Sequence, residues 1–348
     1  MPSLTDLLGT ALPLIQAPMA GIQTHAMAIA VSNAGGLGSL PAAMLSPDQL
    51  RDELTAIRAG TSKPYNVNFF AHTNPAPDAA REAVWRDALR KYHAEFGLDV
   101  DAVPPGAGRA PFDAAIADLV EPFRPPVVSF HFGLPAPDLL ARVKGWGSRI
   151  LASATTVDEA LWLERHGVDA VIAQGLEAGG HRGIFLTDDL TTQVPTFALL
   201  PQVVAAVKVP VIAAGGIADA AGVRAAMALG AAGVQVGTSY MLCDEASTSA
   251  LHRKALQSEA ARHTALTTLF TGRPARGIVN RLMRELGPLS PSAPPFPTAT
   301  AAIAPLRAKA EATGSGDFSP LWSGQNPTGV KPVGAAVMTT ELAKGFAN

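Results

Sequence analysis

Short apolar runs alternate along this chain with longer stretches of helical period. Most of the runs are apolar at nearly every position, as expected for strands buried on both faces of a parallel sheet. The eight candidate strands are Leu14–Ala17, Gly38–Leu40, Asn66–Phe69, Val127–Phe130, Arg149–Ala152, Ala170–Ala173, Val209–Ala213 and Gly233–Val236. Eight strands that alternate with helices predict an α/β fold, a (β/α)8 TIM barrel rather than an open sheet.

The helical stretches carry start and stop signals. Ser46–Ala59 opens with Ser-Pro-Asp, an N-cap residue followed by proline in the first turn. In Thr156–His166, Glu159 lies three residues after the threonine, which predicts a capping box. Asp219–Leu229 begins at an aspartate and stops before Gly230, a residue suited to a helix C-terminus. These signals support the strand–helix alternation.

Two segments are too long for ordinary connections in a barrel. The first contains a charged helical stretch at Pro77–Phe96 and another at Phe112–Phe123, which can supply a barrel helix. The second holds a polar helical stretch and the proline-rich run Pro288–Pro297. We expect the two insertions to form a cap over the C-terminal ends of the strands. The prediction assigns residues 1–70, 126–241 and 318–348 to the barrel and residues 71–125 and 242–317 to the cap.

Composition narrows the possible classes of protein. The chain has 348 residues and a formal net charge of −2, so neither nucleic acid nor an anionic membrane surface is an expected partner. The single cysteine, Cys243, excludes intramolecular disulfides and multi-cysteine zinc sites, and favours a reducing, cytoplasmic location. Met1–Gly9 lacks the basic start of a secretory signal, and Lys208 and Pro210 interrupt the apolar run Val203–Ile217. We therefore expect no membrane-spanning helix, and the oligomeric state stays open.

Glycine-rich polar residues follow most of the candidate strands, at the rim where TIM barrels bind ligands. After the seventh strand, Gly215 and Gly216 permit close approach of backbone N–H groups to a phosphate, and the helix near Asp219 adds its positive end. After the eighth, Gly237 and Thr238 can add N–H groups and a hydroxyl. Tight turns without a ligand are the alternative, but the two turns one βα unit apart predict a phosphate site.

Amides and histidines complete this rim. Asn68 and Gln174 are polar ends of apolar strands, and their amides suit the edge of an isoalloxazine ring or, alternatively, loop backbone groups. His181 follows Gly179 and Gly180 on a loop, where an imidazole can take a proton or balance an anion. His131, after the fourth strand, is a second catalytic candidate; packing is its alternative role.

Four segments together resemble the nitronate monooxygenases, formerly called 2-nitropropane dioxygenases. The segments are Leu14-Ile15-Gln16-Ala17-Pro18-Met19-Ala20-Gly21, Asn33-Ala34-Gly35-Gly36-Leu37-Gly38, Gln174-Gly175-Leu176-Glu177-Ala178-Gly179-Gly180-His181 and Ala213-Ala214-Gly215-Gly216-Ile217. The similarity runs through nearly the whole chain, from Pro13 to the segment Leu321-Trp322-Ser323-Gly324-Gln325. His131-Phe132-Gly133 and the long insertion resemble the class I branch of that family.

The resemblance implies non-covalent FMN, with His181 as the catalytic residue and Met19 beside the flavin ring. With the glycines noted above, the expected cofactor-binding residues are Met19, Asn68, Gln174, Gly179, Gly180, Gly215, Gly216, Gln235, Val236, Gly237 and Thr238. The implied reaction is the oxidation of alkyl nitronates, such as propionate 3-nitronate, by O2 to a carbonyl compound and nitrite.

The cap segment departs from the class I pattern. The resemblance implies tyrosines and a lysine there, but Pro294–Ala304 contains Phe296 and neither of those residue types. Arg281, Arg284 or Arg307 can substitute as the group that binds the substrate anion. Two alternatives stay open: an FMN-dependent NAD(P)H:quinone or enoyl-acyl-carrier reductase of the same superfamily, and a barrel that binds a phosphate ligand without redox chemistry.

Overall fold

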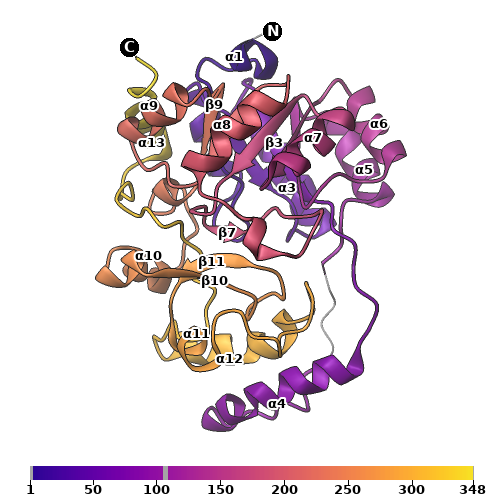
Figure 1. Ribbon diagram of the computed structural model, residues 1–348, viewed down its shortest axis with the longest axis vertical. Helices are drawn as coiled ribbons and strands as arrows, with labels where there is room; N and C mark the ends of the chain where they lie inside the picture. Colours follow the sequence, from indigo (N-terminus) through magenta and orange to yellow (C-terminus); the bar gives the residue numbers. More distant parts are fainter. Residues whose placement is uncertain (1–2, 105–108, 348) are drawn as a thin grey trace.

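Eight parallel strands form a nearly closed barrel in the computed structural model, which describes residues 3–104 and 109–347 (Figure 1). The sheet order is β1-β9-β8-β6-β5-β4-β3-β2, and a parallel bridge between Ile15 and Leu37 joins the outer strands β1 and β2. The strands are β1 (Leu14–Gln16), β2 (Gly38–Pro41), β3 (Tyr65–Phe70), β4 (Val127–His131), β5 (Arg149–Ala154), β6 (Ala170–Gln174), β8 (Val211–Ala214) and β9 (Gly233–Val236). The TIM-barrel prediction is confirmed, and the strand ends differ from the predicted ones by at most two residues.

Helices surround the barrel, and a short one closes its N-terminal end. The surrounding helices are α2 (His25–Asn33), α3 (Pro47–Gly60), α5 (Ala114–Val120), α6 (Pro137–Gly145), α7 (Val157–Arg165), α8 (Thr196–Ala206), α9 (Ala220–Ala228) and α13 (Ala335–Ala343). Leu4 and Leu8 of α1 (Leu4–Leu8) join the buried cluster that includes Ile15, Ile172 and Ile212. The end of the barrel opposite α1 is therefore the one left for a ligand.

The predicted helix starts are correct, but one cap works differently. Ser46 and Gln49 form a reciprocal capping box at α3. Thr156 accepts a hydrogen bond from the backbone N–H of Glu159, but the Glu159 carboxylate does not return it. Fully buried, that carboxylate instead accepts from the Thr155 backbone and hydroxyl and from the Phe185 backbone N–H. Glu159 thus holds the loop that follows His181.

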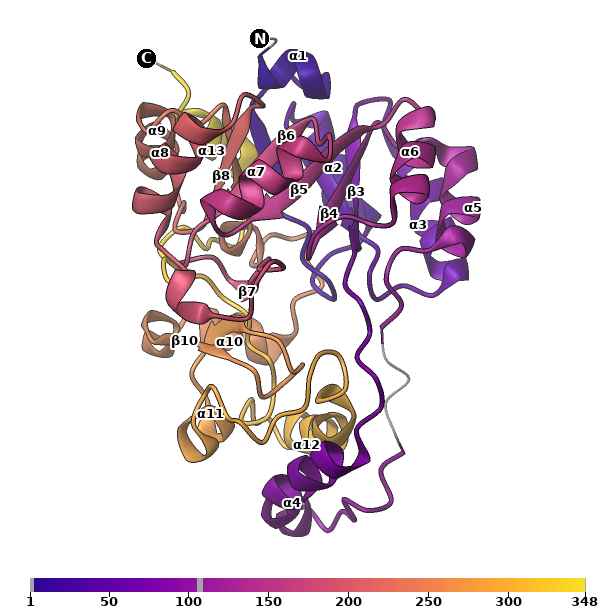
Figure 2. The ribbon, with the colours of Figure 1, turned by 45° about the vertical axis from the view of Figure 1, so that its right-hand side comes forward.

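A second layer lies beyond the strand C-termini (Figures 1 and 2). Its three-stranded antiparallel sheet has the order β10-β11-β7. Its elements are α4 (Ala79–Glu95), β7 (Gly180–His181), α10 (Ala250–Leu256), β10 (Thr264–Thr267), β11 (Ala275–Ile278), α11 (Arg281–Leu286) and α12 (Thr300–Ala312). Trp85, Leu89 and Tyr92 of α4 pack with Ile303 and Leu306 of α12 in a buried cluster separate from the barrel core.

Helix α5 belongs to the barrel rather than to the cap. Its residues Ala117 and Val120 belong to the main barrel core, and it packs against α3 and α6. We therefore propose that the cap comprises residues 71–111 and 242–317; residues 105–108 lie outside the described part.

Short 3-10 turns connect other elements: η1 (Glu121–Phe123), η2 (Leu190–Thr192), η3 (Thr238–Tyr240) and η4 (Glu259–Arg262). Across the described residues, no helix combines the length and apolar character needed to cross a membrane.

Candidate active site

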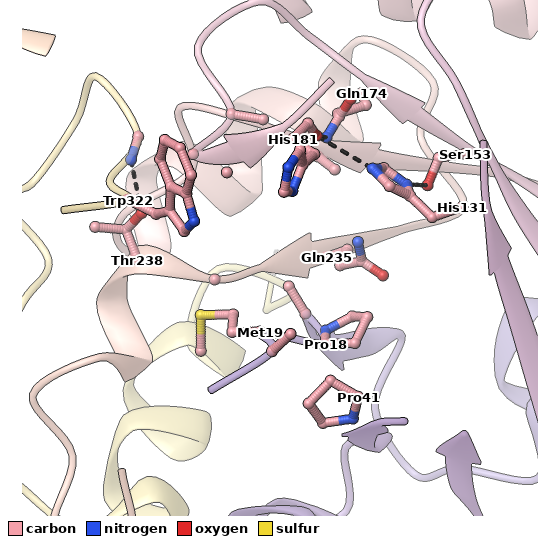
Figure 3. Close-up of a pocket in the computed structure, with 18 of the residues that line it drawn as sticks. Pro18, Met19, Pro41, His131, Ser153, Gln174, His181, Gln235, Thr238 and Trp322 are labelled. Carbon is pink, nitrogen blue, oxygen red and sulfur yellow. Dashed lines mark hydrogen bonds between the residues drawn. The ribbon is translucent and has the colours of Figure 1, made fainter. Parts of the chain in front are cut away.

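A pocket lies at the C-terminal ends of the strands, between barrel and cap (Figure 3). Twelve of the thirteen predicted site residues line it: Met19, Asn68, His131, Gln174, Gly179, Gly180, His181, Gly215, Gly216, Gln235, Gly237 and Thr238. The exception is Val236, whose side chain is buried in the barrel core. Side chains alternate along a strand, so Gln235 reaches the pocket whereas its neighbour Val236 points the other way.

The turn after β8 requires glycine at two successive positions. Gly215 has φ 112° and Gly216 has φ 75°, in the region that side chains disfavour. A Cβ on Gly215 would approach Thr196 Oγ1 to 2.9 Å, whereas one on Gly216 would meet nothing closer than 3.6 Å. Close protein contacts therefore add a second reason for glycine at Gly215, whereas at Gly216, which also lines the pocket, the positive φ is the reason that the described chain gives.

A C-terminal segment completes the same wall, and sequence reasoning missed its role. The Gly324 backbone N–H donates to Thr238 Oγ1 at 2.9 Å, and Asn326 Nδ2 donates to the Gly216 carbonyl at 3.0 Å. A Cβ on Gly179 would lie 2.6 Å from the Gly324 nitrogen, so glycine there admits this segment. The similarity around Leu321–Gln325 was the available signal, but only the tertiary structure places it in the pocket.

Two amides in the pocket keep unsatisfied acceptor atoms. Gln235 Oε1 is buried and has no hydrogen-bond partner among the described residues. Asn68 Nδ2 donates to the carbonyl and hydroxyl of Ser129 at 3.2 and 2.9 Å, which orients the side chain and leaves Oδ1 without a protein donor in the described chain. An unpaired buried polar atom costs about 1–3 kcal/mol. A ligand with N–H or O–H donors would recover that free energy.

Gln174 contacts the loop that carries His181. Its Nε2 donates to the His181 carbonyl at 3.0 Å, and its Oε1 accepts from the Gly183 N–H at 2.8 Å. The side chain thus satisfies loop backbone groups, the alternative considered for it above. Although Gln174 lines the pocket, its amide is a support for the His181 loop.

The His181 imidazole projects into the pocket from a loop fixed on both sides (Figure 3). Strand β7 pairs with β11 through Ala275 and Arg276, so the loop belongs to the cap sheet. His181 Nε2 lies 2.9 Å from Thr271 Oγ1, and Nδ1 has no protein partner within the described residues. Burial first, and the Arg109 charge second, hold the pKa of His181 well below 6.5. The lowered pKa favours the neutral form of the His181 imidazole near pH 7.

The His131 ring contacts the backbone of His181 rather than the His181 ring. The His181 carbonyl can only accept, so His131 Nε2 carries the proton that it donates across 3.1 Å. His131 Nδ1 then accepts from the Ser153 hydroxyl at 3.1 Å. Burial lowers the pKa of His131 to about 4, so this tautomer is uncharged at neutral pH. The geometry makes His131 a support for the His181 loop.

Aromatic rings pack beside His181, and one of them, Phe70, lines the pocket. Phe70, Phe132 and Phe296 form one buried cluster, and the Phe296 ring centroid lies 5.6 Å from that of His181. Phe132 has φ 72°, a conformation that is rare for a bulky residue and recurs at functional sites. The His72 ring, just after β3, packs at the edge of this cluster, and its centroid lies 4.8 Å from that of Phe296.

The predicted arginine substitutes lie elsewhere. Arg281 pairs with Glu95 and Glu285 on the surface, Arg307 pairs with Glu311, and Arg284 is exposed. None of the three arginines lines the described pocket. Arg109, from the connection between α4 and α5, does line it. No sequence pattern singled out Arg109, because its position depends on the path of a long connection.

Comparisons with known proteins place these features in a family. The family described as "Nitronate monooxygenase" matches residues 1–342. A nitronate monooxygenase of Pseudomonas aeruginosa is 41% identical over 98% of this chain and 97% of its own length. One of Paraburkholderia phytofirmans is 42% identical over 98% of this chain and 94% of its own.

Solved structures support the same family. Nitroalkane oxidase from Streptomyces ansochromogenes superposes with a TM-score of 0.88 at 36% identity, covering 99% of both chains. FabK from Thermotoga maritima superposes with a TM-score of 0.72 at 27% identity, covering 99% of this chain and 96% of its own. The predicted resemblance is confirmed by the full-length match, the two relatives and the nitroalkane oxidase fold: the chain is an oxidoreductase that belongs to the nitronate monooxygenase family.

Proposed function

We propose that this protein uses FMN to oxidise alkyl nitronates with O2, forming a carbonyl compound and nitrite. The observation that carries the proposal is the His181 imidazole, neutral and rigidly held, in a pocket with glycine turns and unpartnered amides. Family membership supports nitronate oxidation as the reaction class.

The residues present fit FMN. The acceptor Gln235 Oε1, which has no donor in the described chain, suits an N–H of the isoalloxazine ring, and Asn68 Oδ1 can take a second contact. Gly216 and the Thr238 hydroxyl, which still has a proton to donate, would hold the phosphate. Met19 would lie beside the ring. When bound, FMN accepts electrons from the nitronate and passes them to oxygen.

His181 would act on the substrate as an uncharged imidazole. In that form it can accept a proton from a neutral nitroalkane or donate a hydrogen bond to a nitronate oxygen. Gln174 and His131 both donate to the His181 carbonyl, which limits movement of the loop. The buried cluster of Phe70, Phe132 and Phe296, of which Phe70 lines the pocket, would help to exclude water from the reacting carbon.

The arginines argue against efficient use of NADH. A reductase needs cations that converge on the dinucleotide pyrophosphate. Arg273 donates to the Ile184 carbonyl, Arg276 donates to the Leu176 carbonyl at 2.9 Å, and Arg281 is engaged by carboxylates. None of these three side chains lines the pocket, and Arg109 alone among the described arginines does. One cation does not make a cluster for a pyrophosphate, so the nitronate reaction is favoured over the reductase alternative.

A flavin spectrum followed by anaerobic stopped-flow mixing tests the proposal. The purified protein should be yellow, and propionate 3-nitronate should bleach the flavin rapidly whereas NADH should do so poorly. Rapid bleaching by NADH with none by the nitronate would support the quinone or enoyl reductase alternative. A colourless protein that binds no added FMN would support the barrel without redox chemistry.

A further inference from the structure

The two actions open to an uncharged His181 need its single ring proton on opposite nitrogens. Nδ1 has no hydrogen-bond partner among the described residues, yet it is not one of their buried unpaired atoms, so it is open to the pocket that His181 lines. Nδ1 is therefore the nitrogen that can meet a substrate. With the proton on Nδ1, His181 donates a hydrogen bond to a nitronate oxygen. With the proton on Nε2, Nδ1 can accept the α-proton of a neutral nitroalkane.

The other ring nitrogen is contacted by one hydroxyl of residues 3–104 and 109–347. Thr271 Oγ1 lies 2.9 Å from His181 Nε2, and the threonine is buried in the turn before β11. A hydroxyl can donate or accept, so this contact alone is compatible with both tautomers. The remaining neighbours of the Thr271 hydroxyl decide between them.

Those neighbours are the two polar atoms of the Arg273 backbone. The Arg273 carbonyl is 3.3 Å from Thr271 Oγ1, beyond the range of about 2.5–3.0 Å in which a hydroxyl donates to an oxygen. The Arg273 N–H, 3.5 Å away, can only donate to the hydroxyl. The best acceptor for the Thr271 proton is therefore His181 Nε2. A buried hydroxyl proton without an acceptor is unfavourable, so the surroundings of Thr271 leave Nε2 unprotonated.

His131 has the opposite arrangement in the same pocket. Its Nε2 faces the His181 carbonyl, which can only accept, and its Nδ1 accepts from the Ser153 hydroxyl (Figure 3). In both histidines a hydroxyl donates to one ring nitrogen, and the proton lies on the other nitrogen. The His131 proton is used within the protein, whereas the His181 proton faces the pocket.

We infer that Thr271 fixes the tautomer of His181 with the proton on Nδ1, so that His181 donates a hydrogen bond to the bound nitronate rather than removing a proton from a nitroalkane. The inference rests on the proposed function, because it takes the reacting nitro group to lie at His181. A nitronate has already lost its α-proton and carries its charge mostly on the nitro oxygens, so it needs a donor and no base. Thr271 is thereby a positioning residue that acts through His181.

Nitrogen-15 NMR of the holoenzyme labelled at histidine measures the tautomer directly. In the wild type, His181 should have a protonated Nδ1 and an unprotonated Nε2, and His131 should have the reverse in the same spectrum. His181→Asn and His131→Asn assign the signals by their loss. Thr271→Val, which has a similar shape and no hydroxyl, should shift His181 toward protonation at Nε2. Thr271→Ser, which keeps the hydroxyl, should retain the wild-type pattern.

Anaerobic flavin bleaching by propyl 1-nitronate and by 1-nitropropane measures the consequence for the substrate. In Thr271→Val, the ratio of kcat/KM for the nitronate to that for the nitroalkane should fall by about 10-fold, as expected when one hydrogen bond to a charged ligand is lost. Thr271→Ser should restore the ratio. Thr267→Val is the matched control, because Thr267 is buried in the same cap sheet, and its hydroxyl accepts from the Leu269 N–H at 3.1 Å. Thr267→Val should keep the wild-type ratio even if its stability falls.

The spectrum and the ratio separate the possible failures. A wild-type His181 protonated at Nε2 would overturn the inference. An unchanged ratio in Thr271→Val, or an equal fall in Thr271→Val and Thr267→Val, would do the same and leave nitronate oxidation intact. If neither nitro compound reduces the wild-type flavin, the proposed function fails, and the nitrogen-15 spectra of the wild type and Thr271→Val still decide whether Thr271 fixes the tautomer.

Discussion

The two sides of the active-site pocket differ in whether they present backbone or side chains. One side, here called the glycine side, consists of Gly215, Gly216 and Gly237, which follow β8 and β9 directly. The other, the cap side, presents Phe70, at the end of strand β3, and Arg109, on the connection between α4 and α5, with Phe296 packed behind them. The glycine side presents backbone at the ends of strands, whereas the cap side presents side chains, and Arg109 and Phe296 come from long connections.

We propose that this difference separates cofactor binding from substrate selection. Backbone groups at strand ends move little, because the barrel hydrogen bonds hold them, and they suit a constant ligand. Side chains on the cap can change without disturbing the barrel, and they suit a ligand that differs between relatives. His181 lies between the two, on a loop tied to β6 by Gln174 and to the cap sheet by β11.

The largest effect is expected at His181, where the two sides meet. His181→Asn should lower turnover by about 10²–10⁴-fold, the range of a positioned acid or base, while FMN remains bound. His131→Asn should lower it less, because His131 acts through the His181 backbone. Anaerobic flavin bleaching measures turnover, and the protein-bound flavin spectrum measures occupancy. Near wild-type bleaching by His181→Asn would remove His181 from the mechanism.

The glycine side is tested by a matched pair of substitutions. Gly216 and Gly314 both have positive φ, 75° and 83°, and a Cβ on either meets no heavy atom of the described chain closer than 3.6 Å. Each alanine variant should therefore cost a similar 1–2 kcal/mol or so in backbone strain. Only Gly216→Ala should also weaken FMN binding, by about 10-fold, which corresponds to about 1.4 kcal/mol.

Fluorescence titration of apoprotein with FMN measures this pair. If both alanine variants bind FMN as tightly as the wild type, the phosphate site after β8 is contradicted. If both bind FMN more weakly than the wild type and to the same extent, strain rather than contact with the cofactor reduces binding. Either result would weaken the proposed division between a glycine side that binds the cofactor and a cap side that selects the substrate.

The smallest effect concerns stability against pH, and it compares a histidine of the barrel with a histidine of the cap. Burial lowers the pKa of both His131, in the barrel, and His252, whose Nε2 donates to the Trp322 carbonyl, to about 4. Below pH 6.5 these histidines bind protons in the unfolded chain but stay unprotonated in the native protein. The free energy of unfolding should therefore fall as the pH drops from 6.5 to 4, by up to about 1.4 kcal/mol per pH unit for each histidine.

Urea unfolding at several pH values measures this slope. His252→Gln should make the slope shallower by up to one proton's contribution, whereas His166→Gln, an exposed control, should leave it unchanged. A steeper slope in His252→Gln, or an equal change in both variants, would contradict the assignment of a neutral buried His252.

Sequence patterns predicted the barrel and the glycine side well, for a shared reason. Buried parallel strands appear as short apolar runs, and the residue after each run must lie at the C-terminal rim. Gly215, Gly216 and His181 could therefore be assigned to one site without knowing any distance. Even there, the period of a strand was overlooked at Val236, which faces the core while Gln235 faces the pocket.

Side-chain partners could not be predicted from the sequence in the same way. Gln174 carries an amide suited to a flavin, but the neighbouring loop engages both of its ends. Glu159 has the spacing of a capping box, but burial directs its carboxylate to the loop after His181. In both cases the local pattern states what a side chain can bind, whereas packing decides which partner it meets.

The sequence by itself determined the fold class, the rim on which the site lies, and the family, because these depend on periodicity and local motifs. Only the tertiary structure decided that His181 belongs to a cap strand and is neutral, that Gly324 and Asn326 complete the wall, and that Arg109 rather than Arg281, Arg284 or Arg307 borders the pocket. The physical reason is that burial and ion pairing depend on contacts between distant segments, and a linear pattern does not specify those contacts.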